Sequence, residues 1–208
     1  MNKLRIDDNG KLDEASRLAF KTLRSNIEFY GEDKKVIAFS SCRDKEGKSM
    51  VALQTACEFA RNDKKVVIIM ADFRKTMVNG KQALCGFLDV LLKQSAIEDV
   101  LYETDMKNLH LMFAGGSLET RNAIIDVNEL SGVLMYFRQM YDYVFIDMAT
   151  AGKNANDLTI YSQCDGVVLV VETNKVARKL AKHVIESVEQ SGCKVFGIVL
   201  NDKDEIKS

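Results

Sequence analysis

One short stretch, SSCRDKEGKSM at residues 40–50, places a glycine, a lysine and a serine in direct succession. Gly47 permits close approach of a ligand to the backbone, the Lys48 ammonium can bind phosphate oxygens, and the Ser49 hydroxyl can take a place beside Mg²⁺. An apolar run at residues 34–41 precedes the stretch and a helical pattern follows it, so backbone N–H groups and the helix dipole would face one point. The stretch predicts a phosphate-binding loop, with these candidate nucleotide-binding residues: Asp44, Lys45, Glu46, Gly47, Lys48, Ser49 and Met50.

The loop departs from the usual motif at its first position, where Cys42 stands in place of a glycine. Other residue types can make this turn if their backbone dihedrals stay in allowed regions, so the departure does not exclude a working loop. A short match of this kind also arises by chance in surface loops. The strand pattern before it and the helical pattern after it favour phosphate binding.

Two aspartates follow apolar strands further along the chain: Asp72 after VVIIMA and Asp147 after YVFI. Carboxylates at strand ends beside a phosphate loop are typical of Mg²⁺ coordination, directly or through water. Ser49, Asp72 and Asp147 are therefore candidate metal-binding residues, and Lys48 and Asp72 are candidate catalytic residues. Each aspartate alone could equally be a helix N-cap, so the prediction depends on the pair.

The rest of the chain supplies elements that would bring these residues together. Apolar runs alternate with segments of helical period, which predicts an α/β fold of three layers, with a mostly parallel central sheet and helices on both faces. Right-handed crossovers would gather the loops after the strands along one edge. Strands are expected at residues 34–41, 64–72, 108–116, 141–147, 164–173 and 193–202, all but the third as buried strands; helices are expected at residues 12–30, 48–63, 87–104, 128–141 and 176–192.

Composition narrows the class of protein. The 208 residues carry a formal net charge of -1, so no overall field favours nucleic acid. No apolar run approaches the ~20 residues of a membrane span and the N-terminus is unlike a signal peptide, so we expect a cytoplasmic protein without direct membrane insertion. Five scattered cysteines and two histidines argue against a zinc site. We expect one domain, with an N-terminal helical segment (1–33), a core (34–201) and a short tail (202–208).

Together these segments resemble the bacterial tyrosine kinases of capsule and exopolysaccharide synthesis, which are P-loop NTPases related to the cell-division and plasmid-partition ATPases MinD and ParA. The resemblance covers residues 12–201. AFKTLRSNIEF resembles the family's N-terminal helix, the stretch around EGKS its Walker A region, and YDYVFID its Walker B strand. It implies a P-loop NTPase fold. It also implies a membrane adaptor of the polysaccharide co-polymerase type, recruitment by that adaptor to the inner face of the plasma membrane, and a homo-oligomeric ring.

The resemblance also assigns roles to residues. It implies that residues 47–49 hold ATP or ADP and that Mg²⁺ lies near Ser49, Asp72 and Asp147. It implies that Asn201, at the end of the last predicted strand, contacts the adenine base. A strand-end asparagine is also an ordinary turn residue.

Departures from the family pattern bear on activity. The family's second motif reads aspartate-x-aspartate, and Met70 replaces its first aspartate. Methionine can neither accept a proton nor hold Mg²⁺, so phosphoryl transfer should slow by orders of magnitude while nucleotide binding is spared. In the ring-forming motif Lys21 and Arg24 match the basic positions, but Leu18 replaces a glutamate. The chain ends NDKDEIKS, without the family's tyrosine cluster.

Three functions remain open. They are an active tyrosine kinase with an unusual site, an impaired pseudokinase that serves as a nucleotide-gated scaffold, and a positioning ATPase of the partition or division type. The last would use an extra lysine early in the loop, and Lys45 lies two positions too late for that role. Tyr141 and Tyr143 flank an apolar strand and are expected in the core rather than as phosphorylation substrates.

Overall fold

A computed structural model of the chain describes residues 3–6, 12–73, 77–78, 81–82, 85–116, 120, 123–152 and 156–202. Its main feature is an eight-stranded sheet with the order β1-β6-β7-β3-β8-β2-β9-β10. The strands of this sheet are β1 (Lys3–Leu4), β2 (Val36–Ser41), β3 (Val66–Met70), β6 (Leu101–Thr104), β7 (Leu109–Met112), β8 (Tyr143–Asp147), β9 (Gly166–Glu172) and β10 (Val195–Asn201). A separate antiparallel pair is formed by β4 (Met77–Val78) and β5 (Lys81–Gln82).

Neighbouring strands of the large sheet run parallel, except that β6 and β7 are antiparallel. The carboxyl ends of β2, β3, β8, β9 and β10 therefore lie along one edge. Met70 pairs in register with Asp147, and Asn201 pairs in register with Glu172. This edge collects the strand-end residues that the sequence singled out, as predicted.

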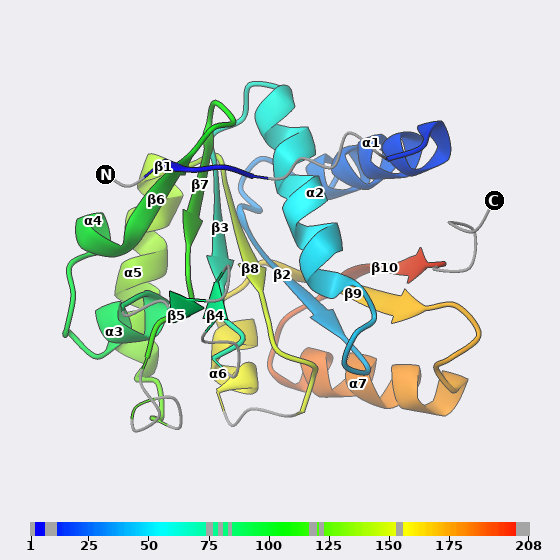
Figure 1. Cartoon of the computed structure of the whole chain (residues 1–208). Helices are drawn as coiled ribbons and strands as arrows, with labels where there is room; N and C mark the ends of the chain where they lie inside the picture. The colour runs from blue at the N-terminus through cyan, green and yellow to red at the C-terminus, as the bar shows by residue number, and fades with distance from the viewer. Residues whose placement is uncertain are drawn as a thin grey trace.

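Helices cover both faces of the sheet (Figure 1). They are α1 (Glu14–Glu28), α2 (Lys48–Arg61), α3 (Phe87–Leu91), α4 (Ile97–Val100), α5 (Val127–Met140), α6 (Asp157–Ser162) and α7 (Arg178–Gln190). Successive strand residues alternate between the two faces. Ile37 and Phe39 of β2 pack in the cluster that includes residues of α1 and α2, whereas Val36 and Ala38 pack in the cluster that includes α3, α5 and α6. The predicted three-layer α/β architecture is confirmed.

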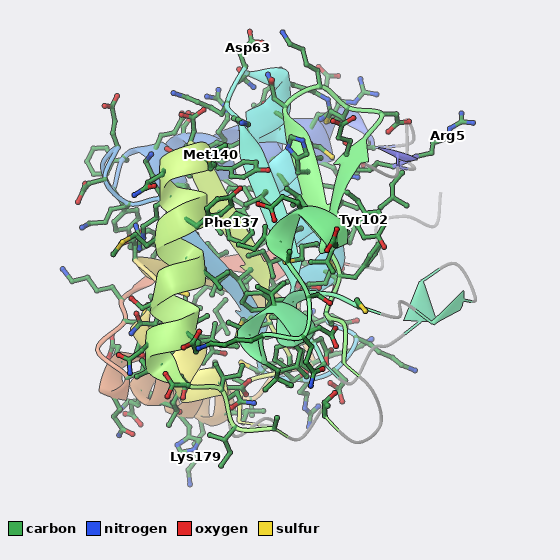
Figure 2. All side chains as sticks on the ribbon, turned by 90° about the vertical axis from the view of Figure 1, so that its left-hand side faces the viewer. Arg5, Asp63, Tyr102, Phe137, Met140 and Lys179 are labelled. Atoms are coloured by element: carbon green, nitrogen blue, oxygen red, sulfur yellow. The ribbon has the colours of Figure 1, made fainter. Side chains whose placement is uncertain are left out.

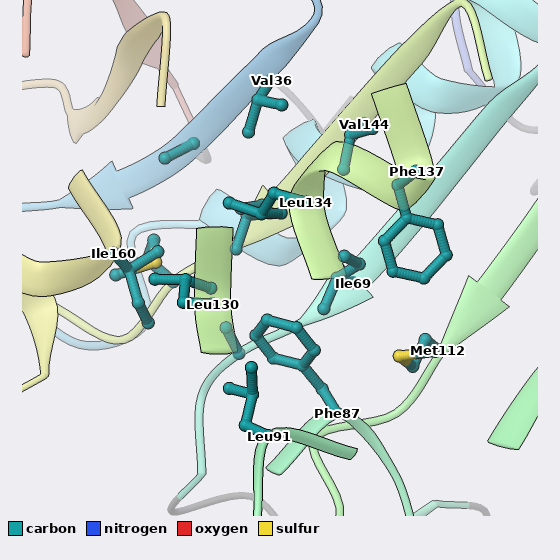
Figure 3. Packing of buried hydrophobic residues seen from close by; sticks show 14 of the residues in the cluster. Val36, Ile69, Phe87, Leu91, Met112, Leu130, Leu134, Phe137, Val144 and Ile160 are labelled. Carbon is teal, nitrogen blue, oxygen red and sulfur yellow. The ribbon is translucent and has the colours of Figure 1, made fainter. Parts of the chain in front are cut away.

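The larger apolar cluster lies between the sheet and α5. Leu130, Leu134 and Phe137 come from successive turns of α5 and belong to the same buried cluster as Ile69 of β3 (Figure 3). Phe137 is fully buried, whereas Met140 at the end of the helix is 46% exposed, so α5 presents one face to the sheet (Figure 2). This amphipathic spacing is the signal that predicted the helix.

Some elements differ from their prediction. Residues 87–104 were expected as one helix, but they form α3, α4 and β6, because the backbone turns into the left-handed region at Lys93 (φ 59°) and β6 then pairs with β7. The strand expected to be buried at residues 193–202 is the edge strand β10, where Leu200 is 70% exposed. The helix α6 was not predicted.

The N-terminal segment also differs, since β1 joins the sheet beside β6 instead of belonging to a purely helical extension. Of the predicted tail, residues 203–208 lie outside the described residues. Within the part of the chain that the structure describes, none of the helices combines the length and apolarity needed to cross a bilayer.

The packing predicts a large loss of stability for Phe145→Ala. Phe145 is fully buried in β8, with its ring centroid 5.4 Å from that of Phe39 and 5.2 Å from that of Phe59. Truncation should leave a cavity and lower the free energy of unfolding by about 3–5 kcal/mol, measured by urea denaturation. As a control, Phe29→Ala truncates a residue that is 90% exposed and should change the free energy of unfolding by less than about 0.5 kcal/mol. A loss at Phe145 no larger than the control would contradict the packing.

Candidate functional site

A pocket of about 490 Å³ opens where the carboxyl ends of the strands meet α2. All seven predicted loop residues line it, together with one of the two predicted aspartates. Its lining is Ser41, Asp44, Lys45, Glu46, Gly47, Lys48, Ser49, Met50, Asp72 and Thr150. The loop motif and Asp72 thus lie at one pocket, whereas Asp147 is not part of its lining, and the binding roles of all these residues stay predictions.

The loop at residues 44–50 has the backbone that the predicted phosphate site would require. The chain turns through the left-handed region at Lys45 (φ 66°) and again at Gly47 (φ 86°), which is the N-cap of α2. The α2 helix begins at Lys48 directly behind the turn. First-turn N–H groups have no intrahelical acceptor and carry the positive end of the helix dipole, so they favour an anion at this point.

A buried ion pair joins the loop to β8. The Lys48 Nζ lies 3.1 Å from the Asp147 Oδ1, and the two side chains are only 7% and 0% exposed. Charges taken out of water are costly unless they are paired, so each of these groups stabilises the buried charge of the other. The pair joins Lys48, which lines the pocket, to Asp147 at the end of β8, which is absent from the pocket lining given above.

The site also fits a divalent cation. The second carboxylate oxygen of Asp147, Oδ2, is buried and has no hydrogen-bond partner among the described residues. Asp72 is buried and, with Ser49, lines the pocket. In the described ranges no three His, Cys, Asp or Glu side chains cluster as a metal site by themselves. This suits Mg²⁺, which is usually held by one or two carboxylates together with substrate phosphates and waters.

The position of the missing carboxylate lies next to this ion pair. Met70 is the register partner of Asp147, and in parallel strands such partners project to the same face. Its half-buried side chain packs with the cluster on the α2 side of the sheet. A thioether offers neither negative charge nor a hard oxygen ligand here.

The residues Asn201 and Glu46 make contacts inside the protein. The Asn201 Nδ2 donates a hydrogen bond to the backbone carbonyl of Glu46 at 2.9 Å. The Glu46 carboxylate accepts from the backbone N–H groups of Arg43, at 2.7 Å, and Glu172, at 3.2 Å. Asn201 is absent from the pocket lining given above. An adenine contact from Asn201 stays a prediction.

Sequence reasoning missed two contributors to the site. Thr150 lines the pocket and donates a hydrogen bond from its hydroxyl to the Asp44 carboxylate. Its place three residues after Asp147, in a loop at the same edge, was the available signal. The contact from the Glu172 backbone N–H could not be predicted from the residue type, because every residue except proline carries this donor.

Three residues discussed above for their side-chain chemistry, one cysteine and two tyrosines, lie in the protein interior. Cys42 is buried and packs with Leu169 and Val171. Burial, with a smaller contribution from the negative Glu46, raises the pKa of its thiol to about 11. Tyr141 and Tyr143 are both buried, and burial raises the pKa of each hydroxyl, as fits the core positions predicted for them.

The sequence matches one protein-family model and several bacterial proteins. A family model described as an AAA domain matches residues 34–195. The tyrosine-protein kinase CpsD of Streptococcus agalactiae is 29% identical over 211 residues, covering 99% of this chain and 92% of that protein. The tyrosine-protein kinase YwqD of Bacillus subtilis (strain 168) is 30% identical over 190 residues, covering 88% of this chain and 80% of that protein. The succinoglycan biosynthesis transport protein ExoP of Rhizobium meliloti is 26% identical over 180 residues, covering 84% of this chain but 23% of that protein.

Solved structures share the fold. The chimerical protein CapA2B2 superposes with a TM-score of 0.82 at 22% identity, covering 96% of this chain and 92% of that chain. The septum site-determining protein MinD of Pyrococcus horikoshii OT3, complexed with Mg-ADP, superposes with a TM-score of 0.67 at 21% identity, covering 80% of this chain and 70% of that chain. Both likenesses establish the three-layer fold.

The pKa of Cys42 predicts an unreactive thiol. Thiolates are the reactive form, and a thiol with a pKa of about 11 stays protonated near pH 8. In the native protein, iodoacetamide should label Cys42 at least ~10-fold more slowly than the exposed Cys85, as followed by mass spectrometry. The labelling rate of Cys42 should rise about tenfold with each pH unit and level off only near pH 11, because the thiolate fraction grows in this way below the pKa. Equal rates near pH 8 would contradict the burial of this loop position.

Proposed function

Because the chain belongs to this AAA domain family and to the bacterial tyrosine-protein kinases that it matches, we propose that its pocket binds ATP and ADP with Mg²⁺. We propose further that it acts in capsular or exopolysaccharide synthesis, as a protein of the tyrosine-kinase type. Family membership implies nucleotide binding in general. The observation that carries the specific proposal is the buried Lys48–Asp147 pair, 3.1 Å apart, at the start of α2.

The predicted catalytic and metal-binding residues each have a task in this proposal. The Lys48 ammonium neutralises the β- and γ-phosphate oxygens, and the loop N–H groups surround them. Ser49, Asp72 and Asp147 hold Mg²⁺, which supplies charge neutralisation at the phosphates when it is bound. Asp72 is the remaining carboxylate of the motif that Met70 interrupts, so we assign it the catalytic role beside Lys48.

A second candidate is a nucleotide-gated scaffold that transfers phosphate poorly. The observation that favours it is Met70, whose thioether occupies the position beside Asp147 where the family pattern has a carboxylate. Phosphoryl transfer depends on positioning and charge stabilisation, so loss of one carboxylate lowers the rate more than the affinity for nucleotide. Under this candidate the nucleotide controls assembly instead of serving as a phosphate donor.

The partner we propose is a membrane adaptor of the polysaccharide co-polymerase type, which would bring the protein to the inner face of the plasma membrane. Support comes from the relative named as a succinoglycan biosynthesis transport protein, in which the matched region is 23% of the length. We also propose that the chain assembles into a homo-oligomeric ring, with α1 forming contacts between neighbouring copies. On this helix Leu18 is exposed, while Arg24 pairs within the chain with Glu28 at 2.9 Å.

Lys48→Ala tests nucleotide binding. Removing the ammonium leaves Asp147 as an unpaired buried charge and deletes the main cation for the phosphates, so the Kd for ADP and ATP should rise by roughly tenfold or more in calorimetric titrations with Mg²⁺. Lys107→Ala is the matched control, because that side chain is 85% exposed in the turn between β6 and β7. An unchanged Kd for ADP and ATP in Lys48→Ala would contradict the proposal.

Met70→Asp separates the two candidate functions. If the missing carboxylate limits catalysis, the variant should phosphorylate a tyrosine peptide about 10²-fold faster than the wild type, while its Kd for ADP stays within about threefold. Met70→Leu keeps the apolar bulk without a carboxylate and should match the wild type. A wild type that already transfers phosphate as fast as Met70→Asp would exclude the scaffold.

A further inference from the structure

Two neighbouring strand ends hold a single residue of the phosphate loop. Asn201 and Glu172 are register partners at the ends of β10 and β9. The Asn201 amide donates to the Glu46 carbonyl at 2.9 Å, and the Glu172 backbone N–H donates to the Glu46 carboxylate at 3.2 Å. Glu46 is buried, and its other carboxylate oxygen accepts from the Arg43 N–H at 2.7 Å. The main chain and the side chain of Glu46 are therefore both fixed.

This clamp sets the direction of one peptide group. The described residues contain no cis peptide bond, so the Gly47 N–H points opposite to the Glu46 carbonyl. The carbonyl faces Asn201, which lies outside the pocket lining, whereas Gly47 lines the pocket. A carbonyl oxygen aimed at phosphate would repel it, and an N–H aimed there attracts it. The hydrogen bond from Asn201 thus directs the N–H end of this peptide away from β10, where it would attract phosphates bound in the pocket.

The glycine at position 47 leaves room for the Asn201 side chain beside the loop. Gly47 has a φ of 86°, and a Cβ at this position would overlap the Asn201 side-chain amide. The close approach of Asn201 to the loop is thus available only because residue 47 has no side chain. The backbone carbonyl of Asn201 is in turn held by the N–H of Thr173 at 3.1 Å, so the amide is presented from a fixed strand end.

We propose that Asn201 is a positioning residue for the phosphates. It acts through the Glu46–Gly47 peptide, whose N–H it orients, and not through contact with the adenine base. The inference rests on the proposed nucleotide-binding function of the same pocket. It assigns the end of β10 to phosphate affinity and leaves base preference to other residues.

Asn201→Asp is the sharpest variant. Aspartate has the same shape but replaces the amide donor with an acceptor oxygen, which repels the Glu46 carbonyl and favours rotation of the peptide. That rotation would turn the Gly47 N–H toward β10 and the carbonyl toward the pocket. Asn174→Asp is the matched control, because it makes the same charge change at an exposed turn beside the same edge of the sheet.

The measurement uses inorganic pyrophosphate, which has no base, together with ADP and GDP, in calorimetric titrations. Asn201→Asp should raise the Kd for pyrophosphate and the Kd for ADP by the same factor, roughly tenfold or more. The preference for ADP over GDP should stay unchanged. Asn174→Asp should bind all three as the wild type does. Amide hydrogen exchange in residues 43–49 should be faster in Asn201→Asp than in the wild type.

Other outcomes overturn the inference in distinguishable ways. Unchanged pyrophosphate affinity with a lost preference for ADP over GDP would assign Asn201 to the base. A wild type that binds neither pyrophosphate nor ADP would overturn both the proposed function and this inference. Should Asn201→Asp fail to fold, Asn201→Ala removes the donor without adding charge, and wild-type affinity for pyrophosphate in that variant would refute the positioning role.

Discussion

The ion pair between Lys48 and Asp147 is the contact on which the rest of the site depends. It joins the first residue of α2 to the last residue of β8, across a sequence separation of 99 residues. Neither charge would be tolerated alone at this depth, because a buried charge without a partner costs several kcal/mol, on the order of 3–5 when one partner is removed. The parallel sheet brings the two residues to one edge, and the pair fixes their orientation. The pocket, the loop and the candidate cation ligands are arranged around them.

Beside this pair lie the loop proposed to bind phosphates and Met70, which departs from the family pattern. Gly47, Lys48 and Ser49 have the positions and chemistry that phosphates require. On the neighbouring strand β3, Met70 is the register partner of Asp147 and contributes apolar packing to the α2 side of the sheet. A side chain can add to the stability of the core and still remove a functional group, since the two effects depend on different properties of that side chain. The two candidate functions differ at this residue.

Much of the fold and of the pocket was predictable, and the reasons differ between residues. The turn that begins α2 and the place of Asp147 at the end of β8 were predictable because these residues follow apolar strands, and their binding roles stay predictions. The strand β6 was not predictable, because a segment as short as Leu101–Thr104 fits a helix or a strand, and only its pairing with β7 decides. The edge position of β10 was hidden for a similar reason, since strand order is a tertiary property. The contacts of Glu46 with main-chain donors have no sequence signal at all.

The clamp on Glu46 has a consequence for how the protein is made. Asn201 holds a residue that lies 155 positions earlier in the chain. During synthesis, the loop and the α2 segment leave the ribosome long before β10 does, and contacts between residues so distant in sequence form late. The cradle therefore reaches its final geometry only when the last strand is in place. A nascent or C-terminally truncated chain would carry the complete loop motif and still lack the contact from Asn201 that holds the Glu46 carbonyl.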